Sequence, residues 1–339
     1  MTRCCTTLVG MILLGLGPLG CDTTRSTSTT KEGTITIGVV PMSSQHDFWK
    51  SIHAGAIKAA RELDVEIIWK APLQNENLQE QVDIVESFGV LGVDGLVLAP
   101  VDRNALVTPV ENSVRRRIPV VIIDSALESD QQISFVATDN YQGGVAGAQE
   151  LARLLEGKGK IIMLRSYEGV ASTMNREQGF LDTLEEYPDM EVVSSNQRTT
   201  GTSESAYQKA EQLLARFKTE EGDPSIDGIF TSCEPCSFGM MRAMEDSKIA
   251  GKIVHVGFDA SPALVQGLRS GDLDAIVVQD PIKMGYLGVK TLVAHLHGEQ
   301  VAGRHDTGVY VITRENVDDP ENKDVVEPDL DRWLKDGGH

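Results

Sequence analysis

The chain has 339 residues, of which 41% are hydrophobic and 24% charged, and its formal net charge at pH 7 is −19. This length suits two domains of ordinary size, and the composition is sufficient for normal cores. The negative charge argues against binding nucleic acid or anionic lipid head groups, because like charges repel within a Debye length, but it is compatible with a neutral ligand.

The first 21 residues are typical of an export signal. Arg3 provides the positive start, and the apolar run over residues 8–19 is too short to span a bilayer. The run ends in the sequence PLGC, which is similar to a bacterial lipobox, so Cys21 is a candidate for lipid attachment. A plain secretory signal that is cut nearby remains the alternative. Residues 22–33 are rich in Thr and Ser and predict a flexible tether.

From residue 34 onward, apolar β-branched runs alternate with amphipathic helical periods. Strands are expected at 34–40, 65–69, 95–99 and 119–123, and helices at 49–63, 78–88 and 105–115. Continuous apolar strands that alternate with such helices indicate a parallel sheet covered on both faces.

The same alternation then repeats. Strands are expected at 135–137, 160–164, 192–193, 228–230, 253–256 and 275–278, and helices at 144–155, 176–187, 203–217, 238–245 and 263–269. Because open sheets seldom exceed about ten strands, the sequence predicts an α/β fold with two doubly wound lobes. Acidic residues crowd the last segment, so 316–339 is expected to be a solvated extension packed loosely on one lobe.

In open parallel sheets, ligands bind beyond the carboxyl ends of the strands, so the residues that follow each strand are the candidates for a site. These candidates are Gln45, His46, Phe48, Trp49, Asp124, Cys233, Asp259 and Gln279. Aromatic rings can cover the faces of a sugar ring, while carboxylates and amides bond to its hydroxyls in a mostly apolar pocket. The set therefore predicts a site for a polyhydroxylated ligand.

Each candidate also has a purely structural interpretation. Phe48 and Trp49 begin a helix and could belong to the core, while Asp124 and Asp259 could cap a turn or the next helix. Gln279 could be an ordinary loop residue. The joint placement of these residues at strand ends favours the binding site.

Two cysteines, Cys233 and Cys236, are expected in the folded part of the chain. They form a C-x-x-C pair, but a single pair without a nearby His is a poor zinc site, so neither a metal nor a cofactor is expected. The sequence leaves open whether the two thiols are bonded. The motifs of phosphate-binding loops, nucleophile elbows and zinc proteases are absent, so no enzymatic activity is expected.

The chain resembles the type I periplasmic sugar-binding proteins, the ribose- and galactose-binding group that delivers ligand to ABC importers. The resemblance covers residues 34–315. It is carried by HDFWKS at 46–51 with GA at 55–56, GVDGLVLAP at 92–100, FVATDN at 135–140, VGFD at 256–259, QDP at 279–281 and DTGV at 306–309.

The resemblance implies a chain that crosses a hinge three times. The N-terminal lobe would comprise 34–138 plus 280–308, and the C-terminal lobe would comprise 139–279 plus 309–315. The ligand would be captured between the lobes and would stabilise the closed form through its extra affinity for that form.

The resemblance also implies a role for each site residue. Phe48 and Trp49 would stack on the sugar, Asp124 and Asp259 would accept its hydroxyls, and Gln279 would bond to it from the hinge.

Three further positions complete the implied site. Gln45 and His46 would lie beside the first loop, and either Asn175 or Arg176 would supply a contact from the second lobe. Cys233 falls where relatives usually carry Asn. Because a thiol cannot make the paired bonds of an amide, the specificity can depart from the ribose and galactose type.

The sequence therefore predicts an exported protein that captures a monosaccharide, delivers it to the membrane permease of an ABC importer and catalyses no reaction. The expected location is the periplasm or cell envelope, and the membrane would be reached only through the lipid anchor. A sensory protein that presents its ligand to a chemoreceptor or sensor kinase would use the same closed form and remains an alternative. A transcription repressor of this fold would need an N-terminal helix-turn-helix and a basic face, whereas this chain begins with a signal and a tether.

Overall fold

The computed structural model describes residues 33–73 and 77–335. The predicted export signal, the candidate lipid-attachment residue Cys21 and the tether up to residue 32 lie outside these ranges. In the described part of the chain, no helix combines the length and the apolar character needed to cross a bilayer.

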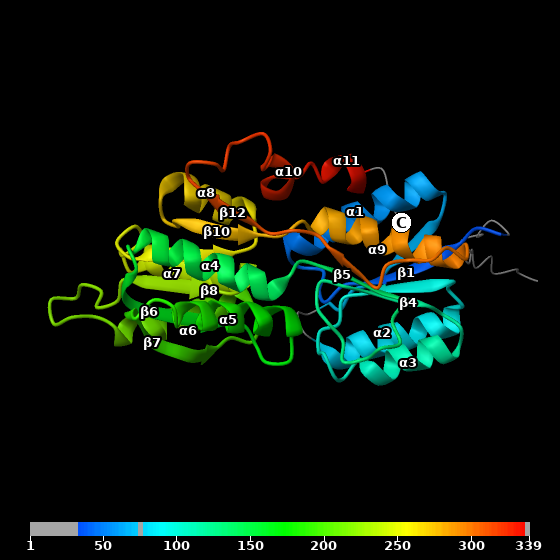
Figure 1. The fold of residues 1–339 in the computed structure, drawn as a ribbon, viewed down its shortest axis with the longest axis horizontal. Coiled ribbons are helices and arrows are strands. Elements are labelled where there is room, and N and C mark those ends of the chain that lie inside the picture. The colour runs from blue at the N-terminus through cyan, green and yellow to red at the C-terminus, as the bar shows by residue number, and fades with distance from the viewer. Residues whose placement is uncertain (1–32, 74–76, 336–339) are drawn as a thin grey trace, which may run out of the picture. The chain divides into compact units, whose positions relative to one another are not determined.

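Two six-stranded sheets organise the chain (Figure 1). The first contains β1 (Thr36–Val40), β2 (Glu66–Trp69), β3 (Gly95–Leu98), β4 (Val120–Ile123), β5 (Ser134–Ala137) and β11 (Arg304–Asp306), in the order β11-β5-β4-β3-β1-β2. The second contains β6 (Lys158–Arg165), β7 (Asp189–Arg198), β8 (Gly228–Thr231), β9 (Val254–Phe258), β10 (Ala275–Val278) and β12 (Tyr310–Thr313), in the order β12-β10-β9-β8-β6-β7. The strand pairs are parallel, except that β12 runs antiparallel to β10.

Helices cover both faces of each sheet, as the buried apolar strands require. In the first lobe, α1 (Asp47–Leu63) and α9 (Pro281–Leu296) lie opposite α2 (Leu78–Leu91) and α3 (Val107–Arg115) (Figure 1). In the second lobe, α4 (Asn140–Leu154) and α5 (Ala171–Leu184) pack on one face, with α6 (Ser203–Arg216), α7 (Glu234–Asp246) and α8 (Pro262–Ser270) on the other. The predicted fold, two doubly wound α/β lobes, is confirmed.

The chain passes between the lobes three times, after β5, after β10 and between β11 and β12. Two of these crossings are bonded to each other. The hydroxyls of Thr138 and Thr307 are 3.1 Å apart, and the Thr138 hydroxyl also donates to the backbone carbonyl of Gly308 at 2.9 Å. These bonds hold the crossing segments side by side at the hinge.

Glycines allow one helix pair in each lobe to pack very closely. An added Cβ on Gly55 of α1 would lie 2.0 Å from the backbone oxygen of Ile282 at the start of α9. An added Cβ on Gly144 of α4 would lie 2.0 Å from the backbone oxygen of Arg176 in α5. The second contact brings Arg176 close to the hinge.

The C-terminal segment differs from the expected loose extension on one lobe. In α10 (Lys323–Val326), Val325 and Val326 are buried in an apolar cluster of the second lobe. The following α11 (Asp331–Leu334) packs against α1 of the first lobe, where Arg61 Nη2 donates to the backbone oxygen of Trp333 at 3.1 Å. The segment therefore contacts both lobes (Figure 1). Its few apolar residues, rather than its many acidic ones, decide where it packs.

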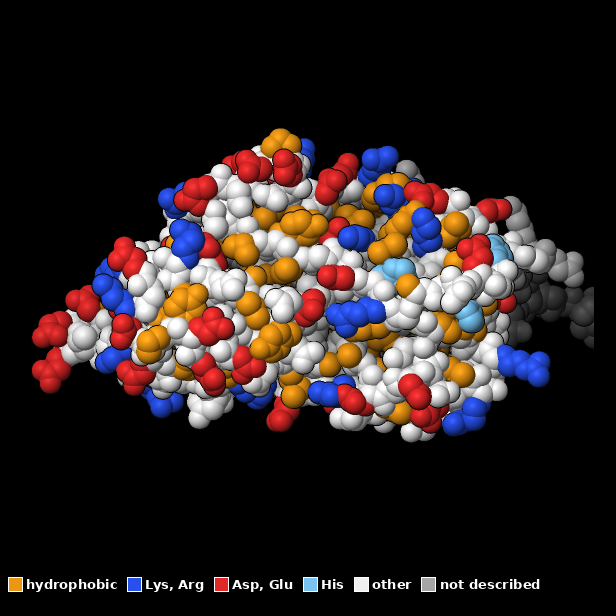
Figure 2. All heavy atoms as spheres, in the orientation of Figure 1, with side chains coloured by type: hydrophobic (Ala, Val, Ile, Leu, Met, Phe, Trp, Pro, Cys, Tyr) orange, Lys and Arg blue, Asp and Glu red, His pale blue; other side chains and the backbone are white. Residues whose placement is uncertain are grey.

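Acidic side chains are spread over the face of the molecule shown in Figure 2 and alternate with basic ones. They do not gather into a single patch on this face. The net negative charge is therefore distributed, which agrees with a general role in solubility.

Candidate ligand-binding cleft

A cleft that encloses a cavity of about 90 Å³ lies between the lobes, where the carboxyl ends of strands from both sheets meet. The first lobe contributes the segment after β1 and the residue after β4. The second lobe contributes the segments after β6, β8 and β9, and Gln279 comes from the second hinge crossing.

Two aspartates occupy equivalent places in the two lobes. Asp124 follows β4 and Asp259 follows β9, and these strands have the same position in their sheets. Both residues have a left-handed backbone, with φ of 61° and 67°, and both are buried, with 4% and 6% of their surface exposed. Left-handed backbone outside glycine is uncommon and concentrates at functional sites. Burial raises the pKa of Asp124 to about 7, although the charge of Arg176 acts in the opposite direction.

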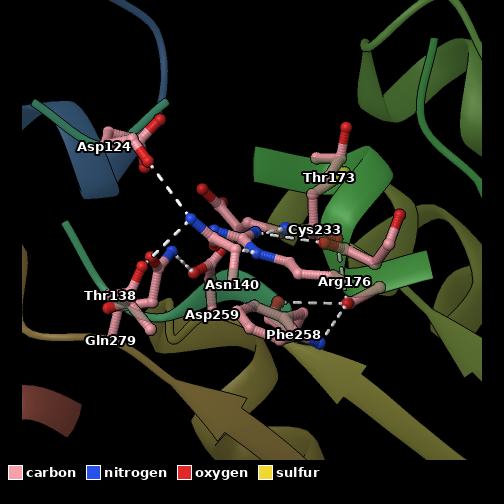
Figure 3. A network of polar contacts seen from close by, with 12 residues as sticks. Asp124, Thr138, Asn140, Thr173, Arg176, Cys233, Phe258, Asp259 and Gln279 are labelled. Carbon is pink, nitrogen blue, oxygen red and sulfur yellow. Dashed lines mark hydrogen bonds and ion pairs between the residues drawn. The ribbon is translucent and has the colours of Figure 1, made fainter. Parts of the chain in front are cut away.

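Arg176 is the centre of a buried polar network in the second lobe (Figure 3). Its Nε donates to Asn140 Oδ1 at 2.8 Å, and its Nη1 donates to the backbone oxygen of Ser232 at 3.1 Å. Nη1 is also 3.6 Å from Asp259 Oδ2, and the guanidinium lies 4.0 Å from the ring centre of Phe258. With only 2% of its surface exposed, Arg176 is a fixed cation at the wall of the cleft.

Asp259 is held by groups from two other segments. Gln279 Nε2 donates to Asp259 Oδ1 at 2.7 Å, and the backbone N–H of Glu234 donates to Asp259 Oδ2 at 3.3 Å. This arrangement orients Gln279 so that its Oε1 has no hydrogen-bond partner among the described residues. Glu234 Oε2 likewise has no hydrogen-bond partner among them. Buried acceptors are normally satisfied. The cleft therefore presents two buried oxygens that the hydroxyls of a ligand, which both donate and accept, would satisfy.

Glu234 also faces His46 across the cleft. His46 Nδ1 lies 3.6 Å from Glu234 Oε2, a separation that would suit an ion pair. Burial, however, lowers the pKa of His46 and raises the pKa of Glu234 to about 8. At neutral pH both side chains are therefore mostly uncharged, and the contact is not an ion pair.

An aromatic wall comes from the start of α1. The rings of Phe48 and Trp49 meet edge to face, with centres 5.0 Å apart and an angle of 88°. Both line the cleft, and Trp49 is also part of the apolar core of the first lobe. Trp49 therefore belongs both to the core and to the wall of the cleft, so the two interpretations of this residue are compatible.

Direct hydrogen bonds join the lobes at the edge of the cleft. The hydroxyl of Tyr167 in the second lobe donates to the backbone oxygen of Val101 in the first at 2.9 Å. The backbone N–H of Ser172 donates to Ser125 Oγ at 3.1 Å. These bonds can form only when the lobes are close, so the structure is a closed form of the cleft.

Comparison with known proteins identifies the family. Residues 37–300 match the model of the periplasmic binding protein domain. This chain belongs to the periplasmic binding proteins.

Two curated relatives illustrate the similarity of this binding protein to others. The xylitol-binding protein of Mycolicibacterium smegmatis is 27% identical over 309 residues, covering 91% of this chain and 84% of the relative. The ribose import binding protein of Bacillus subtilis is 28% identical over 268 residues, covering 78% and 83%.

Solved structures agree with this assignment. An ABC transporter solute-binding protein from Agrobacterium vitis with bound D-fucose has a TM-score of 0.81 and 34% identity, covering 86% of this chain and 99% of its own. A carbohydrate-transporter solute-binding protein from Agrobacterium radiobacter in complex with D-arabinose has a TM-score of 0.83 and 28% identity, covering 88% and 100%.

Most of the residues singled out in the sequence lie in the cleft of this binding protein. Those lining it are His46, Phe48, Trp49, Asp124, Arg176, Cys233, Asp259 and Gln279. Two others do not line the cleft. Gln45 is exposed and its Nε2 donates to the backbone oxygen of Leu73 at 3.2 Å. Asn175 is exposed because one residue along a helix rotates the side chain by about 100°, so Arg176 alone of the two faces the cleft.

Further lining residues of the binding protein were not among those candidates. They include Ser43, Ser166, Tyr167, Ser172, Thr173 and Glu234. Ser43, Ser166 and Glu234 follow strands, so the rule that ligands bind beyond the carboxyl ends of strands could have identified them. The same rule could not have identified Ser172 and Thr173, because α5 begins at Ala171 and not at the expected residue 176.

Proposed function

We propose that this binding protein captures a monosaccharide, or a closely related polyol, in the cleft between its lobes and delivers it to the permease of an ABC importer. The observation that carries the proposal is the closed cleft itself, in which Gln279 Oε1 and Glu234 Oε2 are buried beside an aromatic wall with no hydrogen-bond partner in the described part of the chain. A ring with apolar faces and a rim of hydroxyls matches both features.

The geometry supports a division of roles. Phe48 and Trp49 would contact the faces of the ring, while Asp124 and Asp259 would accept hydroxyls in charge-assisted hydrogen bonds. Arg176, with its partners fixed, would donate to ring or hydroxyl oxygens. Hydroxyls of a bound sugar that donate to Asp124 would favour its ionised form, whereas the exclusion of water from the cleft acts in the opposite direction.

The relatives support the transport part of the proposal. Those quoted above are named for binding or importing xylitol and ribose, and the solved structures contain D-fucose and D-arabinose. Because a relative is named for import, delivery to a permease is favoured over the sensory role. Export to the periplasm, lipid attachment at Cys21 and binding without turnover belong to the same proposal.

A thermal-shift screen tests the proposal. The chain from residue 33 onward would be heated with pentoses, hexoses and pentitols, with amino acids and nucleosides as controls. Binding to the native state raises the melting temperature by mass action, by an amount set by ligand concentration over Kd. A shift confined to amino acids or nucleosides would overturn the sugar assignment. Sustained product release from a bound sugar would overturn binding without turnover.

A further inference from the structure

The C-x-x-C pair at the start of α7 occupies an unusual position. Cys233 is the N-cap residue of the helix and lines the cleft, where Figure 3 shows it beside Arg176. Cys236, in the first turn, is fully buried, and its Sγ lies 3.7 Å from Thr199 Oγ1. Both cysteines are in the thiol form. One thiol therefore faces the ligand site and the other lies behind it.

The two cysteines lie at adjoining places where α7 begins. Cys233 is the N-cap residue, with an extended backbone, and Cys236 is the third residue of the first turn. The side chain of an N-cap residue lies against the first turn, near the second and third helical residues. Disulfides need Cβ atoms about 3.5–4.5 Å apart, and from these positions a small adjustment of the first turn brings the sulfurs into bonding range.

The environments of the two thiols are unequal. The neighbouring Cys236 lowers the pKa of Cys233, although burial and the nearby charge of Asp259 act in the opposite direction. The pKa of Cys236 is raised well above its usual range by the neighbouring Cys233 and by burial. A thiol at a helix N-terminus is further favoured as thiolate. Cys233 is thus suited to attack a disulfide as the nucleophile, and Cys236 is suited to resolve the mixed disulfide that results.

We propose that Cys233 and Cys236 form a redox-active pair, which small disulfides oxidise by entering the open ligand cleft. The Cys233 thiolate attacks one sulfur of the small disulfide, breaks its S–S bond and releases one thiolate, which takes a proton from water. Cys236 then loses its proton and attacks the Cys233 sulfur of the mixed disulfide, so that the second small thiol leaves. Two protein thiols are oxidised to one disulfide, and one small disulfide is reduced to two thiols.

The oxidised pair would alter ligand binding, a consequence that rests on the proposed function. Closure of the disulfide removes the S–H group of Cys233 from the cleft and turns its sulfur toward Cys236. Loss of one hydrogen bond weakens binding by about two- to tenfold. Conversely, a bound sugar would fill the route to Cys233, which is only 8% exposed and lines the cleft.

The test uses the reduced full chain equilibrated with oxidised glutathione, then alkylated with iodoacetamide and digested with trypsin. The tryptic segment 219–242 contains both of these cysteines and no other cysteine, so the N-terminal thiols do not interfere. The expected product is this segment without alkyl groups and lighter by two hydrogens. Two alkyl groups on the segment at equilibrium would overturn the proposal.

Two single variants test the unequal roles. Cys236→Ser should stop at a glutathione adduct on Cys233, because no resolving thiol remains. Cys233→Ser should leave Cys236 without an adduct, since it is fully buried. Equal adducts on both variants would contradict the assignment of Cys233 as the attacking thiol.

The effect on binding is measured separately, by calorimetric titration of the reduced and oxidised chains with the sugar found in the thermal screen. A two- to tenfold weaker Kd after oxidation, and slower oxidation in the presence of that sugar, are expected. Equal affinity in both forms would overturn the link to binding. If no sugar binds either form, the proposed function fails while the disulfide result stands on its own.

Discussion

The two lobes share one strand order but supply different chemistry to the cleft. The first lobe provides the aromatic wall of Phe48 and Trp49 together with Asp124. The second provides the cation Arg176 and its partner Asp259. Equivalent strands, β4 and β9, place an aspartate at the same point in each lobe. The fold therefore fixes where side chains enter the cleft, and the local sequence decides what they do there.

The interiors of the two lobes also differ, although the strand order is the same. The core of the first lobe is one continuous apolar cluster, whereas that of the second is divided into three. Buried polar groups accompany this division. His255 lies 3.0 Å from Thr231 Oγ1, and burial lowers its pKa to about 3, so it is neutral. Arg176 is part of this polar framework of the second lobe, whereas in the first lobe the buried amide of Gln81 bonds to backbone groups alone.

The largest effect is expected from Arg176→Met, which removes the cation and leaves Asp259 buried without it. Breaking a buried pair from one side costs about 3–5 kcal/mol of unfolding free energy, measurable by denaturant titration. Arg242→Met is the matched control, since Arg242 pairs with Glu245 on the surface and should change stability by less than about 1 kcal/mol. Similar losses in both variants would mean that Arg176 does not hold the second lobe together.

Asp124 and Glu234 should each make the free protein less stable as pH rises from 4 to 8. In the folded state Asp124 has a pKa of about 7 and Glu234 of about 8, against ordinary values of 3.8 and 4.5. Between these limits the folded state keeps protons that the unfolded state has lost, so stability falls with increasing pH. Buried His255 contributes with the opposite sign below about pH 6.5, because its pKa in the folded state is about 3. The contribution of Asp124 is therefore measured as the difference in stability between the wild type and Asp124→Asn. This difference should change by about 4 kcal/mol between pH 4 and 7, because each tenfold difference in proton affinity between the two states corresponds to roughly 1.4 kcal/mol. A difference that stays constant over this range would contradict the raised pKa of Asp124.

The paired aspartates allow the lobes to be compared directly. Asp124→Asn and Asp259→Asn should each weaken sugar binding by about 10- to 100-fold, as expected for hydrogen bonds to a charged group, measured by calorimetry. Only Asp259→Asn should also lower stability at neutral pH, because Gln279 and Arg176 bond to that carboxylate. Unchanged affinity in both variants would place the ligand elsewhere.

The smallest effect is expected at the helix contacts. Gly55→Ala and Gly144→Ala would each force a Cβ to 2.0 Å from a backbone oxygen. Overpacking of this kind costs about 1–3 kcal/mol. Gly303→Ala is the control, since nothing lies within 4 Å of its added Cβ. A marked difference between the two lobes in this test would show that one helix pair yields more readily than the other.

The sequence was sufficient for the fold because apolar strands and amphipathic helices alternate so regularly. It was insufficient where tertiary contacts decide the outcome. The helix α9 was not expected; it is capped by Asp280 and buries glycines against α1. Strand β11 is short and polar and forms only by pairing with β5. These elements depend on neighbours that are distant in sequence.

The residues of the cleft were likewise predictable only where they depend on local sequence. Residues directly after strands were found because strand ends converge in any doubly wound sheet. The start of α5 and the partnership of Arg176 with Asn140 were not found, since the two residues lie 36 positions apart. The choice between Asn175 and Arg176 depends on helix rotation, which requires the exact start of α5.

The C-terminal segment limits how far the lobes can rotate apart. Its helices α10 and α11 pack on different lobes and are separated only by residues 327–330. Four extended residues span at most roughly 14 Å. While both helices stay in place, this short span acts as a mechanical stop on the hinge. Wider opening requires α11 to leave α1, so the amplitude of rotation and the docking of a single helical turn are coupled.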